Sequence, residues 1–212
     1  MKPGQVSTID GNEAPCASGI AVVGAALGAV EGATITNSTI SDNHSDHCAA
    51  VSINAPAAYI ANSTIAFNHA ETGAEAGLDA RGTNPFAADA LTMQSSIIAD
   101  NTVGPGTPAD VFVEYLVVLG SDNLVMSLNG APPAGFVATS EDPELGPLQS
   151  NGGPTRTRAL MSSSPAIGLG NDADGAANDQ RGVGYPRTTG ASNAVDIGAF
   201  QFDSIFASAF NY

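Results

Sequence analysis

The sequence predicts an all-β fold, a parallel β-helix (solenoid) with a C-terminal capping region. Two observations carry this prediction. The 212-residue chain is rich in turn-forming residues, with 24 Gly and 13 Pro, and it has no Trp. A short motif that ends in Asn also recurs at irregular intervals of roughly 20–30 residues, as expected for coils whose insertions collect in loops.

The repeated motif is found in five segments, residues 6–12, 34–43, 59–68, 92–101 and 116–123. Their side chains alternate between apolar and polar along the chain, with the period of two that is typical of a β-strand. A single coil cannot bury its inward face alone, whereas stacked coils bury a continuous core. We therefore predict one coil for each repeat.

The Asn that closes each motif has a structural interpretation. Asn tolerates a left-handed backbone at a tight turn, and its amide can bind the equivalent amide of the next coil. We therefore expect a structural Asn ladder of five residues: Asn12, Asn43, Asn68, Asn101 and Asn123.

The two cysteines fall at similar places in the repeat, Cys16 after Asn12 and Cys48 after Asn43. Matching positions on adjacent coils are about one strand spacing apart, so a disulfide is one expectation. Free buried thiols are the alternative. A disulfide would indicate an oxidising compartment.

Charge and hydropathy exclude several classes of protein. The formal net charge of −15 disfavours binding to nucleic acid or to an anionic lipid surface. The 43% content of hydrophobic residues argues against disorder. The apolar run at residues 19–30 is shorter than the ~20 residues of a membrane span, and no signal peptide is visible. Because the repeat starts almost at residue 6, we expect that N-terminal coils are missing from this chain.

Two groups of residues are candidate metal ligands. His44, His47 and His69 could bind zinc, with Cys48 as a fourth ligand only if it is free. Asp172, Asp174 and Asp179 alternate with small residues around Gly175, as in calcium loops, but the closing Glu of an EF-hand is absent. The alternative for both groups is a solvated polar turn. The sequence thus assigns no cofactor with certainty, and calcium at the acidic turn and zinc at the histidines are candidates.

Catalysis on sugars usually requires clustered carboxylates, or a metal with a basic residue. Asp42, Asp100 and Asp122 precede ladder Asn residues and could form one row, but Phe67 interrupts it. The repeat region contains only two basic residues, Lys2 and Arg81. We therefore expect no catalytic residue.

After Gly130 the repeat stops, and five motifs follow in order: DPELGPL (residues 142–148), NGGPTRTRAL (151–160), SPAIGLGN (164–171), DQRG (179–182) and DIGAF (196–200). This region resembles the C-terminal part of the choice-of-anchor Q family of bacterial surface proteins. The resemblance implies a right-handed β-helix of an autotransporter-like or adhesin-like kind. Gly168 and Gln201 depart from the family pattern.

These observations divide the chain into coils at residues 1–130, a cap at 131–201 and an apolar tail at 202–212. We expect the cap to cover the exposed end of the solenoid, over the last coil, because open edges invite self-association. Inside the cap, Arg181 is expected to form an ion pair with Asp179 or Asp196.

Together, the sequence and the resemblance predict a secreted or surface-displayed structural or adhesive module without catalytic chemistry. Its expected partner is a polysaccharide or a cell-surface protein, and the oligomeric state stays open. The chief rival is a polysaccharide lyase or glycosidase, because the fold hosts both. A calcium-stabilised repeat without a ligand of its own is a third hypothesis.

Overall fold

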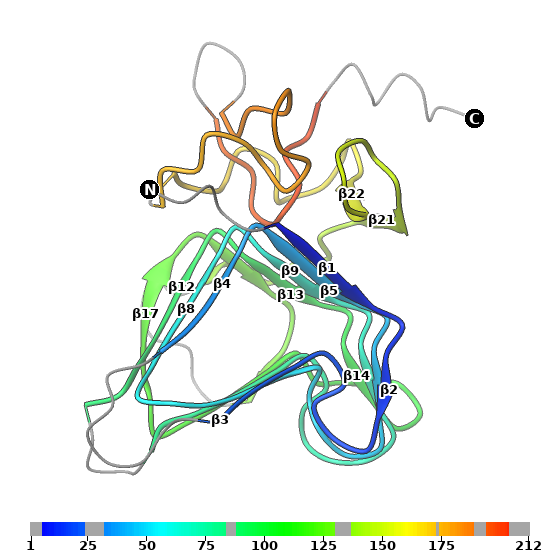
Figure 1. Ribbon diagram of the computed structural model, residues 1–212, viewed down its shortest axis with the longest axis vertical. Helices are drawn as coiled ribbons and strands as arrows, with labels where there is room; N and C mark the ends of the chain where they lie inside the picture. The colour runs from blue at the N-terminus through cyan, green and yellow to red at the C-terminus, as the bar shows by residue number, and fades with distance from the viewer. Residues whose placement is uncertain are drawn as a thin grey trace.

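The computed structural model describes residues 6–23, 32–83, 88–129, 137–172, 174–188 and 194–203. Within these ranges the chain forms twenty-two strands joined by turns, and it contains no helix. Most strands belong to four sheets that run along the axis of a right-handed parallel β-helix (Figure 1). The fold class predicted from the sequence is therefore confirmed.

We name the four sheets A to D. Sheet A contains β1 (Ser7–Asp10), β5 (Ser38–Ser41), β9 (Thr64–Ala66), β13 (Ile97–Ala99), β18 (Asn123–Val125) and β20 (Val137–Thr139). Sheet B contains β2 (Glu13–Ala14), β6 (His44–Ser45), β10 (His69–Ala70), β14 (Thr102–Val103) and the antiparallel β15 (Thr107–Pro108).

Sheet C contains β3 (Ile20–Val23), β7 (Val51–Asn54), β11 (Leu78–Arg81), β16 (Val111–Glu114) and β19 (Leu128–Asn129). Sheet D contains β4 (Ala33–Thr36), β8 (Ala57–Ala61), β12 (Ala90–Gln94) and β17 (Val117–Ser121). In the described residues three coils are complete, β4–β7, β8–β11 and β12–β16, and each passes through sheets D, A, B and C in turn. We number these the second, third and fourth coils, because β1–β3 precede them as the first.

The core lies inside the coils and consists of stacked aliphatic side chains. On sheet A, Ile40 pairs in register with Ile65, and Ile65 with Ile98, so three isoleucines form one fully buried row. Rows of Val, Leu and Ile from sheets C and D meet them in the same apolar cluster. The stacking follows from the in-register parallel pairing, which brings equivalent side chains about 4.8 Å apart.

The C-terminal region lies along the side of the solenoid, over the outer face of sheet A (Figure 1). Ile97 and Ile98 are neighbours in β13 and therefore point to opposite faces. Ile98 lies in the core, whereas Ile97 packs against Leu160 and Phe200 of the cap. Sheet A is thus buried on both faces, as parallel sheets usually are.

Hydrogen bonds from the cap reach every coil from the first to the fourth. Gln180 donates to the carbonyl of Ser7 on the first coil and accepts from Thr39 on the second. Ala199 donates to Thr64 on the third coil, and Asn171 to Ser95 on the fourth. The cap therefore runs along the four coils, which differs from the position over the last coil that we expected.

The solenoid also extends beyond the boundary predicted at residue 130. Strand β20 pairs with β18 and still belongs to sheet A. The cap itself contains one antiparallel hairpin, β21 (Leu145–Gln149) with β22 (Thr157–Leu160), and irregular turns. In the predicted tail, Phe202 packs on the apolar cluster of the cap. Residues 204–212 of the tail lie outside the described residues.

Candidate functional site

An amide ladder runs along the corner between sheets A and B. Asn12 donates from Nδ2 to Oδ1 of Asn43 at 2.8 Å, Asn43 to Asn68 at 2.9 Å, and Asn68 to Asn101 at 2.8 Å. Asn101 in turn donates to Oδ1 of Asp110 at 2.9 Å. Four of the five predicted ladder residues therefore form it, and Asp110 takes the place at its end.

Asn123 was assigned to the wrong corner. It begins β18, where its Oδ1 accepts a hydrogen bond from the backbone N of Ser96 at 3.0 Å. Leu124 pairs with Ile97, so Asn123 stands beside Ser96 at the corner where sheet D passes into sheet A. The sequence pattern was misleading because both corners place a polar residue directly after one with a left-handed backbone, as Asp122 precedes Asn123 here and Asp42 precedes Asn43 in the ladder.

The left-handed backbone at the ladder corner belongs to the residue before each Asn. Positive φ angles occur at Gly11 (64°), Asp42 (58°), Phe67 (60°) and Asp100 (58°), and none of the ladder Asn residues shares them. Each ladder Asn thus contributes its side-chain amide. The left-handed backbone that we expected at the Asn belongs to the residue before it.

The three proposed carboxylates do not form one row, because Asp42 and Asp100 precede ladder Asn residues whereas Asp122 precedes Asn123 at the other corner of sheet A. Arg158 binds both carboxylate oxygens of Asp42, at 2.7 and 2.8 Å, and Asn171 donates to Asp122 at 2.5 Å. Burial raises the pKa of the Asp100 carboxyl, and the nearby acid Asp142 raises it further. Asp42 and Asp122 are therefore bound to residues of the cap.

Buried charges hold the cap together. Arg181 donates to Asp179 from Nη2 at 2.7 Å and lies 3.9 Å from the centre of the Phe200 ring. Asp196 instead accepts backbone hydrogen bonds from Gly168 and Phe202. Of the two ion-pair partners expected for Arg181, the structure therefore pairs it with Asp179.

Arg187 is a second buried arginine of the cap, and it is fully buried. Its Nη2 donates to Asn62 Oδ1 at 2.7 Å on the third coil. Burial lowers the pKa of its guanidinium to about 10, although Asp179 and other carboxylates of the cap oppose this shift. The arginine therefore anchors the cap to the solenoid.

The acidic turn does not gather as a calcium site. Asp179 is occupied by Arg181 and by the backbone N of Gln201, and Asp174 accepts from Asn62 at 2.5 Å. Among the described residues, the groups whose ligand atoms converge are elsewhere, and they do not include Asp172. The carboxylate of Asp179 is thus unavailable to a calcium ion.

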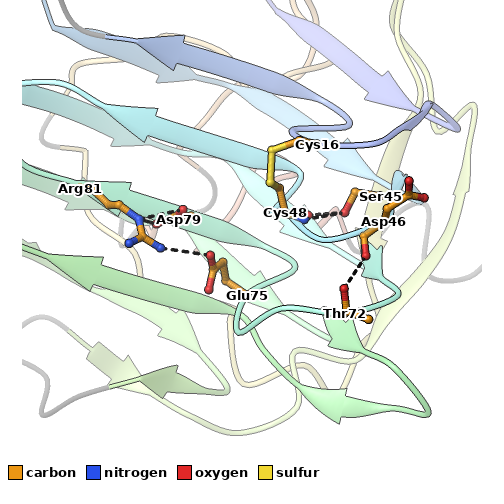
Figure 2. Close-up of a disulfide and its surroundings, with 8 residues drawn as sticks. All are labelled: Cys16, Ser45, Asp46, Cys48, Thr72, Glu75, Asp79 and Arg81. Carbon is orange, nitrogen blue, oxygen red and sulfur yellow. Dashed lines mark hydrogen bonds and ion pairs between the residues drawn. A yellow bond between two sulfur atoms is a disulfide. The ribbon is translucent and has the colours of Figure 1, made fainter.

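Cys16 and Cys48 form a disulfide between the first and second coils (Figure 2). Ser45 hydrogen-bonds both the backbone N and the carbonyl of Cys48. Since both sulfur atoms are bonded to each other, Cys48 is not the free fourth ligand that the zinc hypothesis required. His47 lies beside the disulfide and outside the group formed by the other two histidines.

The other two histidines meet on the outer face of sheet B. His44 and His69 are register partners on β6 and β10, and their ring centres are 5.1 Å apart. Glu71, which the sequence analysis missed, places its Oε1 atom 2.9 Å from Nε2 of His44 and 3.9 Å from Nε2 of His69. The sequence indicates Glu71 by its position two residues after His69, because this spacing keeps both side chains on one face of an extended chain.

A charged cluster on the outer face of sheet C was also missed. Arg81 donates to Asp79 at 2.8 Å, to Glu114 at 3.0 Å and to Glu75 at 3.3 Å, and its guanidinium lies over the Phe112 ring at 4.6 Å. Figure 2 shows Arg81 with Asp79 and Glu75 beside the corner that carries the disulfide. The signal was the Asp-x-Arg alternation, which puts both side chains outward.

Glu75 has the most perturbed setting in this cluster. Its side chain is buried, and in the described part of the protein its Oε2 atom has no hydrogen-bond partner. Burial raises the pKa of the carboxyl, the charge of Asp79 raises it further, and Arg81 opposes the shift. A carboxyl whose pKa is raised by burial is a feature of general acids in catalysis.

An apolar pocket of about 400 Å³ lies within the cap, between the β21–β22 hairpin and the segment that follows Phe200. Leu160, Met161 and Phe202 contribute to its walls.

The part of the chain that the structure describes contains no helix that could span a membrane.

Comparison with known proteins gives no match, so a function is inferred from the fold and from these clusters. No family model, curated protein or solved structure matches this chain.

Proposed function

We propose that this chain is a secreted or surface-displayed β-helix module with a structural or adhesive role, and that it binds a neutral glycan without catalysing a reaction. The supporting observation is the division between covered and open faces. The cap closes sheet A along four coils, whereas the outer faces of sheets B and C carry polar side chains that reach solvent.

The cap covers the outer face of sheet A, which favours a structural stalk over an enzyme. Hydrolysis of a sugar chain usually needs a pair of carboxylates that can flank the scissile bond on an accessible face. Asp42 and Asp122 are bound to Arg158 and Asn171 of the cap. These contacts tie carboxylates at the edges of sheet A to the cap, which favours a structural role for this face.

Sheet C has the chemistry of a glycan-binding surface. Arg81 and Phe112 provide a cation and an aromatic ring, and Ser52 and Asn54 lie beside them on β7 in the same outward rows. Amide, hydroxyl and guanidinium groups can bind sugar hydroxyls, while the ring offers an apolar contact. The net charge of −15 would repel an anionic chain, so we infer a neutral glycan.

Affinity electrophoresis in gels that contain neutral or anionic polysaccharides tests this proposal. We expect a neutral polysaccharide to retard the native protein and an anionic one to have no effect. Arg81→Ala and Phe112→Ala should each abolish the retardation, whereas Arg156→Ala, an exposed arginine of the cap, should preserve it. Equal retardation of all three variants would contradict binding on sheet C.

A polysaccharide lyase or glycosidase is the second candidate, and Glu75 is the observation that favours it. A carboxyl with a raised pKa beside Asp79 and Arg81 suits a general acid. The measurement is the release of reducing ends from neutral polysaccharides by hydrolysis, or of unsaturated products from polysaccharides that contain uronic acids by elimination. Products that disappear in Glu75→Gln, but persist in the control Glu141→Gln at an exposed acid outside the cluster, would establish an enzyme and overturn the non-catalytic proposal.

A further inference from the structure

We propose that His44, His69 and Glu71 form a binding site for a divalent transition-metal ion, best matched by zinc, which joins the second and third coils on the outer face of sheet B. The site is separate from the glycan surface proposed on sheet C. It also differs from the three-histidine site expected from the sequence, because Glu71 replaces His47.

The backbone fixes the position of the three ligands before any ion arrives. Strands β6 and β10 pair in register, so the Cα atoms of His44 and His69 are direct partners. The backbone N of Glu71 donates to the carbonyl of Ser45 at 2.9 Å, which holds the glutamate against the preceding coil. A site built on paired strands loses little conformational entropy on binding.

The ligand atoms already converge. Oε1 of Glu71 is 2.9 Å from Nε2 of His44 and 3.9 Å from Nε2 of His69, and the group as a whole lies within 4.8 Å. Bonds of ~2.0–2.2 Å in a tetrahedral zinc site separate neighbouring ligand atoms by roughly 3.3–3.6 Å. Small side-chain rotations are therefore sufficient to enclose an ion.

A neighbouring hydroxyl supports the required form of one ligand. Nδ1 of His69 lies 3.1 Å from Oγ1 of Thr102, its register partner on β14. An Nδ1–H that donates to this oxygen leaves the lone pair of Nε2 directed toward Glu71. Metal-binding histidines are usually oriented by such a hydrogen bond on the opposite ring nitrogen.

Accessibility and charge also fit a metal ion. The side chains of His44, His69 and Glu71 are 43%, 31% and 57% exposed, so an ion can enter and can keep water at its remaining position. Two imidazoles and one carboxylate suit zinc, whereas calcium prefers oxygen ligands alone. The net charge of −15 attracts cations to the surface.

An ion pair between His44 and Glu71 alone would explain the 2.9 Å contact without a metal. The two interpretations make different demands on His69. The ion pair needs only one histidine, whereas a metal site needs both. Substitution of His69 therefore separates them.

The test is calorimetric titration of chelator-treated, disulfide-bonded protein with zinc chloride, without reductant so that Cys16 and Cys48 cannot contribute ligands. We expect saturable binding of one ion per chain. His69→Ala and Glu71→Gln should abolish saturation, while His47→Ala should leave the affinity unchanged. Thr102→Val, which removes the supporting hydroxyl, should weaken affinity by about 10–100-fold.

Each variant is compared by thermal melting in chelator, so that a folding defect is recognised and His69→Gln can replace a poorly folded His69→Ala. Cobalt provides an independent measurement, since a visible band typical of tetrahedral coordination should form in the native protein and vanish in the His69 variant. Absence of saturable zinc binding, or binding that survives loss of His69, would overturn the proposal.

Discussion

The guanidinium carbon of Arg158 lies 3.9 Å from the centre of the Phe67 ring, and the same guanidinium binds both carboxylate oxygens of Asp42. Phe67 and Asp42 are equivalent residues of the third and second coils, and both have a left-handed backbone just before a ladder Asn. One arginine of the cap therefore contacts two coils at their shared corner, which links the position of the cap to the repeat itself.

We predict that Arg158→Lys lowers the free energy of unfolding by about 2 kcal/mol, because an ammonium cannot bind a carboxylate in the bidentate manner or stack flat on an aromatic ring. Urea unfolding followed by circular dichroism measures the change. Arg156→Lys is the matched control, since this exposed arginine should contribute little. An equal loss in both variants would contradict the role assigned to Arg158.

The middle of the amide ladder should also be sensitive. Asn68→Ala removes hydrogen bonds to Asn101 and Ile40, and it removes the side-chain acceptor that Asn43 has on the next coil. We expect a loss of about 1–3 kcal/mol in the free energy of unfolding. Asn54→Ala, on the exposed face of β7, should change it by less than about 0.5 kcal/mol. A small effect of Asn68→Ala in urea unfolding would show that the ladder contributes little.

Asp110 makes the ladder dependent on pH. Burial raises the pKa of its carboxyl, although hydrogen bonds from Ser127 and Asn101 oppose the shift. An acid with a raised pKa holds its proton more tightly when folded, so its contribution to stability falls as pH rises through the range just above its ordinary pKa. Asp110→Asn removes this loss and can keep the contacts to both neighbours.

The measurement is the difference in free energy of unfolding between Asp110→Asn and the native protein at several pH values. We expect this difference to increase in favour of the variant from pH 3 to pH 6, with the sign given by the raised pKa. All other carboxylates are common to the two proteins and cancel. A difference that is flat or decreases with pH would show that Asp110 is not a strained buried acid.

The disulfide should stabilise the first coil. Cys16 and Cys48 are 32 residues apart in sequence, and closure of a loop of this size contributes about 2–4 kcal/mol. We predict that the double variant Cys16→Ser with Cys48→Ser lowers the melting temperature, and that reductant lowers the melting temperature of the native protein but not of the variant. Hydrogen exchange should locate the effect in β1–β3, and uniform exchange across all coils would contradict a local role.

The fold was predictable because its signals are local and repeated. Alternation in each segment gave the strands, and the recurring Asn gave the corner at which Asn12, Asn43, Asn68 and Asn101 stack. The motif at Asn123 was ambiguous, since Asp-Asn suits either corner of a coil. Only the register of β18 against β13 resolves it.

The position of the cap and the composition of the clusters depend on contacts between distant residues. The Ile-Ile pair at residues 97 and 98 gives no indication of which isoleucine faces a second layer, and the pairing of Arg158 with Asp42 spans 116 residues. Glu71 directly follows a two-residue strand, and Glu75 lies in the turn after it, so the periodic signal here is short. Their partners are set by the stacking of coils, which a single segment does not reveal.

Binding of a glycan without its cleavage can be measured in a single assay. The native protein is mixed with an insoluble neutral polysaccharide, and the sedimented protein and the soluble sugar are measured in the same sample over time. We predict that the protein sediments with the polysaccharide while no reducing ends or unsaturated products form. Soluble products, or protein that stays entirely in solution across a panel of neutral polysaccharides, would contradict the account.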